Sequence, residues 1–137
     1  MKETIFDPLR KKDVPLTPEE EVRQWFIGVL RDNMDVPVHM MMSEVPMKVA
    51  TPSGIKPYRA DIVVYSREAA PLMVVECKRP SVVLSRETAL QALRYASLME
   101  VDWIAITNGP VTFAFRKEDG VFKAVDTLPK YLEMNGK

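Results

Sequence analysis

The sequence predicts an α/β domain in which a mixed β-sheet is flanked by helices. Two observations favour this class. Segments with helical hydrophobic spacing are separated by short apolar runs, and their order is one helix, three strands, a second helix and further strands. The length of 137 residues suits a single domain, and no repeat or low-complexity segment divides the chain.

Composition and charge exclude several classes of protein. With 47% hydrophobic and 28% charged residues, the chain is globular rather than disordered. Its 19 basic residues balance 19 acidic ones, so it does not coat nucleic acid through net charge alone. No apolar run approaches the ~20 residues of a membrane helix, and the N-terminus lacks the apolar segment of a secretory signal. The single cysteine, Cys77, excludes an intramolecular disulfide and a cysteine-built zinc site. We therefore expect a cytoplasmic protein with no membrane partner.

Capping residues predict where the first helix begins. Residues 1–16 contain two prolines and no periodicity, which indicates an irregular arm before a domain over residues 17–137. In "TPEEEVRQWFIGVLRDN", Thr17 suits the N-cap and Pro18 the first helical position, and Glu20 completes a capping box. The apolar stripe that faces the core contains Val22, Trp25, Phe26, Val29 and Leu30.

Three strands are expected next. "SEVPMKVA" (43–50) predicts the first, in which Pro46 indicates an edge strand or a bulge. "YRADIVVYS" (58–66) and "PLMVVECK" (71–78) predict the second and third, joined by a loop of hairpin length.

The remainder of the chain returns to a helix and then to strands. "SRETALQALRYASLMEV" (85–101) predicts a second helix, with Ser85 as its cap and small residues that allow close packing on a sheet. Its apolar face contains Ala89, Ala92, Leu93, Ala96 and Met99. Three further strands are expected at 103–109, 111–120 and 121–125, the last two joined by a turn containing "EDG".

The third strand carries charge where an apolar residue is expected. Alternation places Val74, Glu76 and Lys78 on one face of the strand and Cys77 on the other. Taken alone, the triplet favours a structural ion pair at the strand's end over a catalytic site, because about one acid-x-lysine triplet is expected by chance in such a chain. The triplet alone does not decide between them.

Asp61 in the preceding strand strengthens the catalytic interpretation. Opposed residues of antiparallel neighbours have Cβ atoms ~4.5–5.5 Å apart, and two carboxylates that close repel unless a cation lies between them. A hard cation such as Mg²⁺ suits this arrangement, and Lys78 could orient a water molecule or stabilise charge on a phosphate. The alternative for Asp61 is a structural ion pair with Arg59.

Five stretches in this order resemble the PD-(D/E)xK nuclease superfamily: "TPEEEVRQWFI", "RADIVVYS", "VVECKRP", "QALRYA" and "ITNG". The chain is similar, from about Thr17 to Gly109, to the N-terminal nuclease domain of type I restriction enzyme R subunits and to small stand-alone relatives of that domain. The resemblance implies a restriction-endonuclease-like αβββαβ core. It also implies cleavage of DNA phosphodiesters that depends on a divalent metal.

The resemblance assigns roles to particular residues. Asp61, Glu76 and the backbone carbonyl of Cys77 would bind Mg²⁺ or Mn²⁺, and Lys78 would be the catalytic lysine. One acid from the first helix is also implied, and either Glu19 or Glu20 could supply it.

Gln91 and Tyr95 match the Q-x-x-x-Y element of the family, with Arg94 beside them, and would contact a phosphate near the metal. Positions four apart share one helical face, although a solvated glutamine and an amphipathic tyrosine fit these residues equally well. The basic residues Lys56, Arg59, Arg79, Arg86 and Arg94 flank the expected site as a DNA-facing patch or as scattered surface charges.

Two departures limit what the resemblance implies. Ala60 replaces the proline of "PD", which leaves the carboxylate in place. No G-x-x-x-x-G-K-[ST] loop occurs, so no ATP site and no ATP-driven translocation are expected in this chain. The partners expected are DNA and other restriction–modification subunits, with a homodimer left open. Two rival hypotheses are a nucleic-acid-binding or restriction-complex module that keeps the fold without catalysis, and a globular protein whose charged cluster is only structural.

Overall fold

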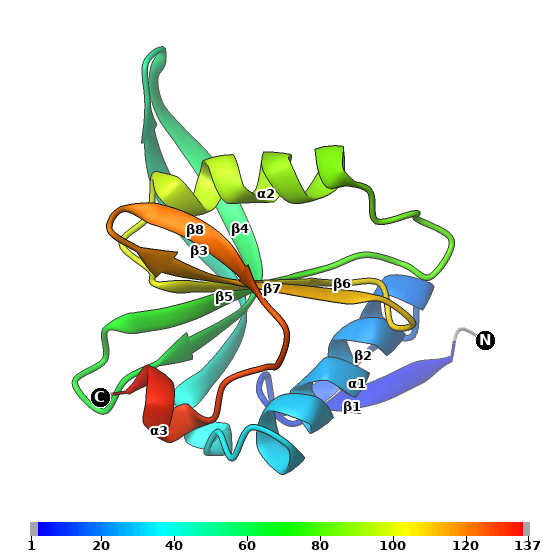
Figure 1. The fold of residues 1–137 in the computed structure, drawn as a ribbon. Helices are drawn as coiled ribbons and strands as arrows, with labels where there is room; N and C mark the ends of the chain where they lie inside the picture. The colour runs from blue at the N-terminus through cyan, green and yellow to red at the C-terminus, as the bar shows by residue number, and fades with distance from the viewer. Residues whose placement is uncertain (1–2, 136–137) are drawn as a thin grey trace.

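The computed structural model describes residues 3–135 and contains a six-stranded mixed sheet (Figure 1). The strand order is β3-β4-β5-β6-β7-β8, and β5 and β6 are parallel whereas the other neighbours are antiparallel. The bounds are β3 Met41–Thr51, β4 Gly54–Tyr65, β5 Pro71–Cys77, β6 Trp103–Thr107, β7 Thr112–Glu118 and β8 Val121–Val125. The predicted mixed α/β class is confirmed.

Helices cover both faces of this sheet (Figure 1). Helix α1 (Pro18–Asp32) and the short α3 (Tyr131–Met134) lie against one face, and α2 (Arg86–Ser97) lies against the other. A 3-10 turn, η1 (Val38–Met40), leads into β3. Helix α2 connects the two parallel strands, because parallel neighbours need a crossover rather than a tight turn.

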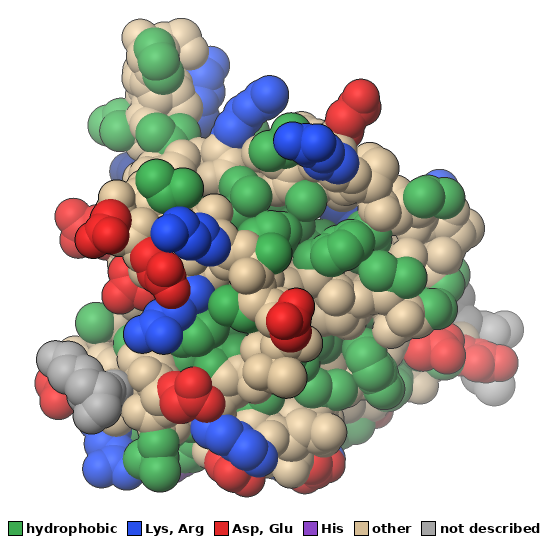
Figure 2. Space-filling view, viewed as in Figure 1, with side chains coloured by type: hydrophobic (Ala, Val, Ile, Leu, Met, Phe, Trp, Pro, Cys, Tyr) green, Lys and Arg blue, Asp and Glu red, His purple; other side chains and the backbone are tan. Residues whose placement is uncertain are grey.

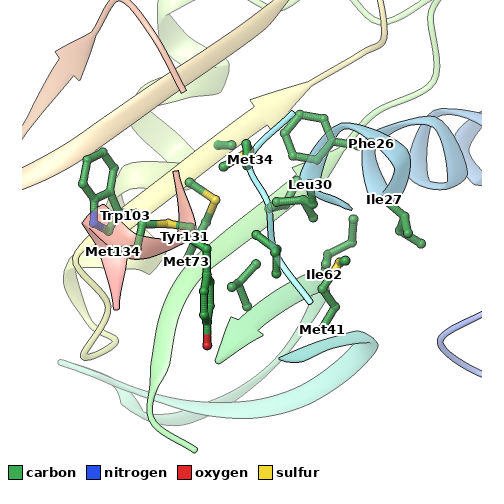
Figure 3. Packing of buried hydrophobic residues seen from close by; sticks show 14 of the residues in the cluster. Phe26, Ile27, Leu30, Met34, Met41, Ile62, Met73, Trp103, Tyr131 and Met134 are labelled. Carbon is green, nitrogen blue, oxygen red and sulfur yellow. The ribbon is translucent and has the colours of Figure 1, made fainter. Parts of the chain in front are cut away.

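The larger core cluster fills the space between α1, α3 and the sheet (Figure 3). Phe26, Ile27 and Leu30 of α1 are fully buried there. They meet Met73, Val75 and Cys77, which project from one face of β5. Trp25 was predicted to belong to this stripe, but its side chain is 48% exposed. Ile27, which was not predicted, is buried instead, so the buried stripe is shifted around the helix from the predicted one.

A second cluster lies under α2. Ala96 of the helix is fully buried against Val63 and Val74, on the opposite face of the sheet from the first cluster. Ala89 is also buried, which confirms that small residues bring α2 close to the sheet, and Met99 is buried just beyond the end of the helix at Ser97. Val74 and Cys77 thus face opposite sides of β5, as the alternation predicts.

The N-terminal segment differs from the irregular arm that was expected. Strands β1 (Thr4–Asp7) and β2 (Lys12–Pro15) form a two-stranded hairpin. Its turn is built on Asp7, whose fully buried carboxylate accepts hydrogen bonds from the Leu9 backbone, from Arg10 and from Ser43 of β3. Burial opposes ionisation of Asp7, but these donors outweigh it and hold its pKa below the ordinary value. Backbone pairing, the hydrogen bonds of Asp7 and the burial of Val14 order this segment, and its few apolar residues show no period along the chain, which is why the pattern missed it.

Only one of the two hydrogen bonds of the predicted capping box forms at the N-terminus of α1. Thr17 accepts a hydrogen bond from the backbone N–H of Glu20 at 3.0 Å, as an N-cap should. The Glu20 carboxylate points elsewhere and accepts from Arg10 and Arg23. None of the helices within residues 3–135 is long and apolar enough to cross a membrane.

Candidate active site

The ends of β4 and β5 bring Asp61 and Glu76 to the same part of the sheet. The register pairs Ile62 with Val75, and Asp61 and Glu76 stand one step beyond that pair. Instead of continuing the ladder, the Asp61 Oδ2 atom accepts a hydrogen bond from the backbone N–H of Cys77 at 2.7 Å. A carboxylate that replaces a backbone partner is anchored to β5 without a metal.

Glu76 is buried on the α2 side of β5. Its side chain is 14% exposed, and its Oε1 atom is buried with no hydrogen-bond partner among the described residues. Burial raises the pKa of Glu76 to about 7; the nearby Lys78 opposes this shift and Glu19 adds to it. Lys78 Nζ lies 3.9 Å from the other carboxylate oxygen. The pair is therefore loose, and one oxygen of Glu76 is left for another ligand.

Glu76 and Lys78 line a cleft of about 220 Å³ between α2 and the sheet. Gln91 and Tyr95 of α2 line the same cleft. The Tyr95 ring stacks on Tyr58 of β4, with ring centroids 5.0 Å apart. The structure thus brings together both residues of the Q-x-x-x-Y element with the acid and the lysine of β5.

Arg94 does not belong to this group. Its side chain is exposed and does not line the cleft, unlike Gln91 and Tyr95.

Arg23 on α1 was not recognised as a site residue, yet it is the partner of Asp61. Its guanidinium is 4% exposed and donates to Glu20, Glu44 and Asp61, each at 3.1 Å. The alternative pairing of Asp61 with Arg59 is wrong, because Arg59 lies 3.8 Å from Glu44 instead. The signal in the sequence was an arginine between Val22 and Phe26, inside the buried stripe.

Glu44 is the second residue that sequence analysis missed. It lies in β3 between residues paired with Ile62 and Ala60, with a φ of 52°. Such a backbone is uncommon for residues other than glycine and often marks a functional position. The irregular backbone accompanies a carboxylate that reaches Arg23, 21 residues away in the chain.

Burial dominates the protonation of Asp61 and Cys77. Burial raises the pKa of Asp61 above its ordinary value, although the Cys77 N–H and the Arg23 charge oppose the shift. Burial, together with the Asp61 charge, raises the pKa of the Cys77 thiol, so the thiol stays protonated. Any role of Cys77 as a ligand therefore falls to its backbone carbonyl.

The two glutamates of the first helix differ in their surroundings. Glu20 is buried, and its oxygens accept from Arg10 at 2.8 Å, Arg23 at 3.1 Å and Gln24 at 3.0 Å. Glu19 is 50% exposed, and its charge contributes to raising the pKa of both Asp61 and Glu76. Glu19 is thus the helix-one acid that is coupled to both carboxylates.

The donor set fits a hard divalent cation. Within residues 3–135 no group of three or more His, Cys, Asp and Glu side chains could hold a metal. Two carboxylates and a backbone carbonyl are oxygen donors of the kind that Mg²⁺ prefers, with water completing the shell. The orphaned Oε1 atom of Glu76 is the observation that favours a cation here, because a buried carboxylate oxygen without a donor is costly.

This fold, a mixed sheet flanked by helices, is that of a restriction-endonuclease-like domain. Residues 18–129 match the family model described as type I restriction enzyme R protein N terminus, and the chain belongs to that family. No curated protein was found to match the chain.

One solved structure shares the fold. It is a fragment assigned to an HsdR subunit of a type I restriction enzyme from Vibrio vulnificus YJ016, with a TM-score of 0.63 and 19% identity. The match covers 87% of this chain and 24% of that one. The present chain therefore spans about a quarter of the length of that relative, and the likeness concerns the fold alone.

Replacing Glu76 with Gln tests the effect of its burial in the metal-free protein. The pKa of Glu76 is about 7 in the folded protein and ordinarily 4.5, so the unfolded chain releases this proton first. The stabilisation from the neutral carboxyl is therefore present below about pH 4.5 and is lost as the pH rises through about 7. At about pH 8 in EDTA we expect Glu76→Gln to be more stable than the parent by on the order of 3 kcal/mol. At about pH 5 the gap should narrow.

Urea unfolding of both proteins at the two pH values measures this gap. Glu100→Gln, at an exposed position, is the control for the loss of one surface charge. A gap of equal size at both pH values would contradict the raised pKa of Glu76.

Proposed function

We propose that this chain is a divalent-metal-dependent endonuclease domain that hydrolyses DNA phosphodiester bonds. The observation that supports the proposal most is the cleft in which Glu76 and Lys78 meet Gln91 and Tyr95. Asp61, anchored to the backbone of Cys77, adds a second carboxylate at the end of the neighbouring strand. A carboxylate, an ammonium and hydrogen-bonding groups thus surround one space that can accept a phosphate, and Asp61 lies outside the lining of this cleft.

Three groups would hold the metal: the carboxylates of Asp61 and Glu76 and the backbone carbonyl of Cys77. When bound, Mg²⁺ or Mn²⁺ would polarise the scissile phosphate and lower the pKa of a water molecule. Asp61 is already oriented by the Cys77 N–H, which lowers the entropy lost on binding. Glu76 has an oxygen free to become a ligand.

Lys78 would align the attacking water and stabilise negative charge on the phosphate. Its ammonium lies 3.9 Å from Glu76, close enough to stay near the carboxylate but too far for a strong hydrogen bond. Gln91 and Tyr95 would donate to the phosphate from the α2 wall of the cleft. Glu19, coupled to both carboxylates, would be the accessory acid.

The family suggests the setting in which this domain acts. We infer that it works on DNA together with other restriction–modification subunits, in the cytoplasm. A formal net charge of zero supports delivery of DNA by a partner, because the chain has no overall attraction for phosphates. The homodimer stays a prediction.

A second candidate is a nucleic-acid-binding module that keeps the nuclease fold. The observation in its favour is Arg23, whose guanidinium already compensates the Asp61 carboxylate at 3.1 Å. Because the Arg23 guanidinium already balances the Asp61 charge, this carboxylate needs a metal less, and the positive charge of Arg23 repels a metal cation. Metal binding and cleavage are therefore tested separately.

Removing the Lys78 amine should abolish cleavage without unfolding the protein. We expect Lys78→Ala to cleave DNA more slowly by roughly two orders of magnitude or more, because it loses charge stabilisation in the transition state. The side chain is partly exposed, so the thermal midpoint should change little. The measurement is cleavage of supercoiled, linear and single-stranded DNA in Mg²⁺ or Mn²⁺. Lys123→Ala, on β8 at the far edge of the sheet, is the matched control.

Divalent metal should stabilise the parent but not a variant that lacks one ligand. At metal concentrations near 100 times the dissociation constant the gain is about 2.7 kcal/mol, or several degrees in the thermal midpoint. Asp61→Asn should lose this shift. Asp119→Asn should keep it, because Asp119 is exposed and Asn also tolerates its φ of 51°.

The outcomes separate the three hypotheses. No metal shift and no cleavage in the parent, with DNA binding retained, would favour the binding module. Absence of all three would leave only a structural role for the charged cluster.

A further inference from the structure

The β3–β4 hairpin extends far beyond the rest of the sheet (Figure 1). β5 pairs with β4 only over residues 62–65, whereas β3 and β4 continue to pair from Val45 and Ala60 out to Thr51 and Gly54. Six further steps of an antiparallel ladder span about 20 Å. The outer part, residues 45–60, is therefore a two-stranded ribbon, and it is called the ribbon below.

The ribbon carries only positive charge. Residues 45–60 contain Lys48, Lys56 and Arg59 and no aspartate or glutamate. All three have exposed or largely exposed side chains, and within the described residues only Arg59 lies near an acid, Glu44 at 3.8 Å. Figure 2 shows Lys or Arg and hydrophobic side chains on this projection at the upper left.

The hairpin at the other edge of the sheet provides a contrast. β7 and β8 also carry cations, including Lys117 and Lys123, but Glu118 and Asp119 lie in the same hairpin. Lys123 is paired with Glu118 at 3.6 Å. Protection of an edge strand explains lysines on either hairpin. It does not explain why one hairpin has two acids among its cations and the other has none.

The cations of the ribbon occupy both of its faces. Lys56 is opposite Val49, on the face that also carries Met47 and Tyr58 and packs toward α2. Lys48 and Arg59 alternate with these residues and lie on the other face. A surface that only needed solubility would not require this arrangement, whereas a ribbon between two rows of phosphates would.

The base of the ribbon forms one wall of the candidate active site. Tyr58 lines the cleft with Glu76 and Lys78, and its ring is held by stacking on Tyr95. Lys56 lies two residues further out on the same face. A DNA strand with a phosphate in the cleft would therefore continue along the ribbon.

We propose that the ribbon binds duplex DNA by entering a groove tip first, an inference that rests on the proposed action of the cleft on DNA. The major groove, about 12 Å wide, admits a two-stranded β-ribbon. In this orientation Lys48 and Arg59 face one phosphate backbone and Lys56 faces the other. Ile55, 71% exposed near the tip, supplies apolar contact with base edges such as a thymine methyl group.

The test compares two double variants of the full chain that lose the same charge. Lys48→Ala/Lys56→Ala alters the ribbon, and Lys117→Ala/Lys123→Ala alters the opposite edge. The dissociation constant for a labelled duplex of about 20 base pairs, roughly two helical turns, is measured in EDTA over a range of salt concentrations. EDTA prevents metal-dependent cleavage, so binding is read alone.

Two lost phosphate contacts should reduce the slope of log K against log salt by about 1.8. We expect the ribbon variant to bind roughly tenfold more weakly at low salt, and the control to stay within about twofold of the parent. The thermal midpoint of the ribbon variant should match that of the parent, because Lys48 and Lys56 are exposed. The control should lose slightly more stability, because Lys117 is half-buried over the Phe122 ring, so binding is measured well below both thermal midpoints.

Several results would overturn the proposal: equal weakening by both double variants, an unchanged ribbon variant, or no measurable duplex binding by the parent at low salt. If the ribbon variant weakens binding of single-stranded DNA as much as binding of the duplex, the ribbon does not enter a groove. If the parent binds duplex DNA through the ribbon but does not cleave it, the proposed nuclease activity is rejected and DNA binding by the ribbon stands. If the parent cleaves DNA and the ribbon variant binds it normally, DNA binding by the ribbon is rejected and the proposed nuclease activity stands.

Discussion

The buried guanidinium of Arg23 is the interaction on which the rest of the site depends. It joins α1 to Glu44 of β3 and Asp61 of β4, and it lies among carboxylates that would otherwise repel one another. Through Glu20 the network continues to Arg10 and so to the N-terminal hairpin. Loss of one partner in such a buried cluster commonly costs roughly 3–5 kcal/mol, because a charge is left uncompensated. Position and charge of Asp61 are thus set by helix packing.

Burial raises the pKa of Glu76, one strand away, as it raises that of Asp61, but Glu76 has no arginine partner. Its surroundings are apolar enough to raise its pKa to about 7, and one of its oxygens has no donor. Folding leaves this group destabilised, and binding of a cation or a proton can recover that free energy. Asp61 and Glu76 therefore divide two tasks at one edge of the sheet. Arg23 and the Cys77 N–H compensate part of the burial of Asp61, and one oxygen of Glu76 is left for a ligand.

Much of the fold followed from local patterns. Alternation in β5 correctly separated Glu76 from Cys77, Pro46 correctly indicated an edge strand, and the small residues of α2 do lie on the sheet. The ribbon was underestimated, since the second strand was expected from residue 58 and begins at Gly54. Residues 54–57 are all exposed, so the hydrophobic alternation that signals a strand is absent there.

By itself, the sequence determined the order of the elements, the caps, and the presence of Glu76 and Lys78 on one strand face with Asp61 one strand away. These features repeat every two or 3.6 residues, so they are encoded in neighbours along the chain. Only the tertiary structure decided that Arg23 serves Asp61 across 38 residues, that Glu19 rather than Glu20 is coupled to both carboxylates, and that Tyr58 and Tyr95 close the cleft. Ion pairs and clefts form between packed elements, and their partners depend on distances in space that no spacing along the chain specifies.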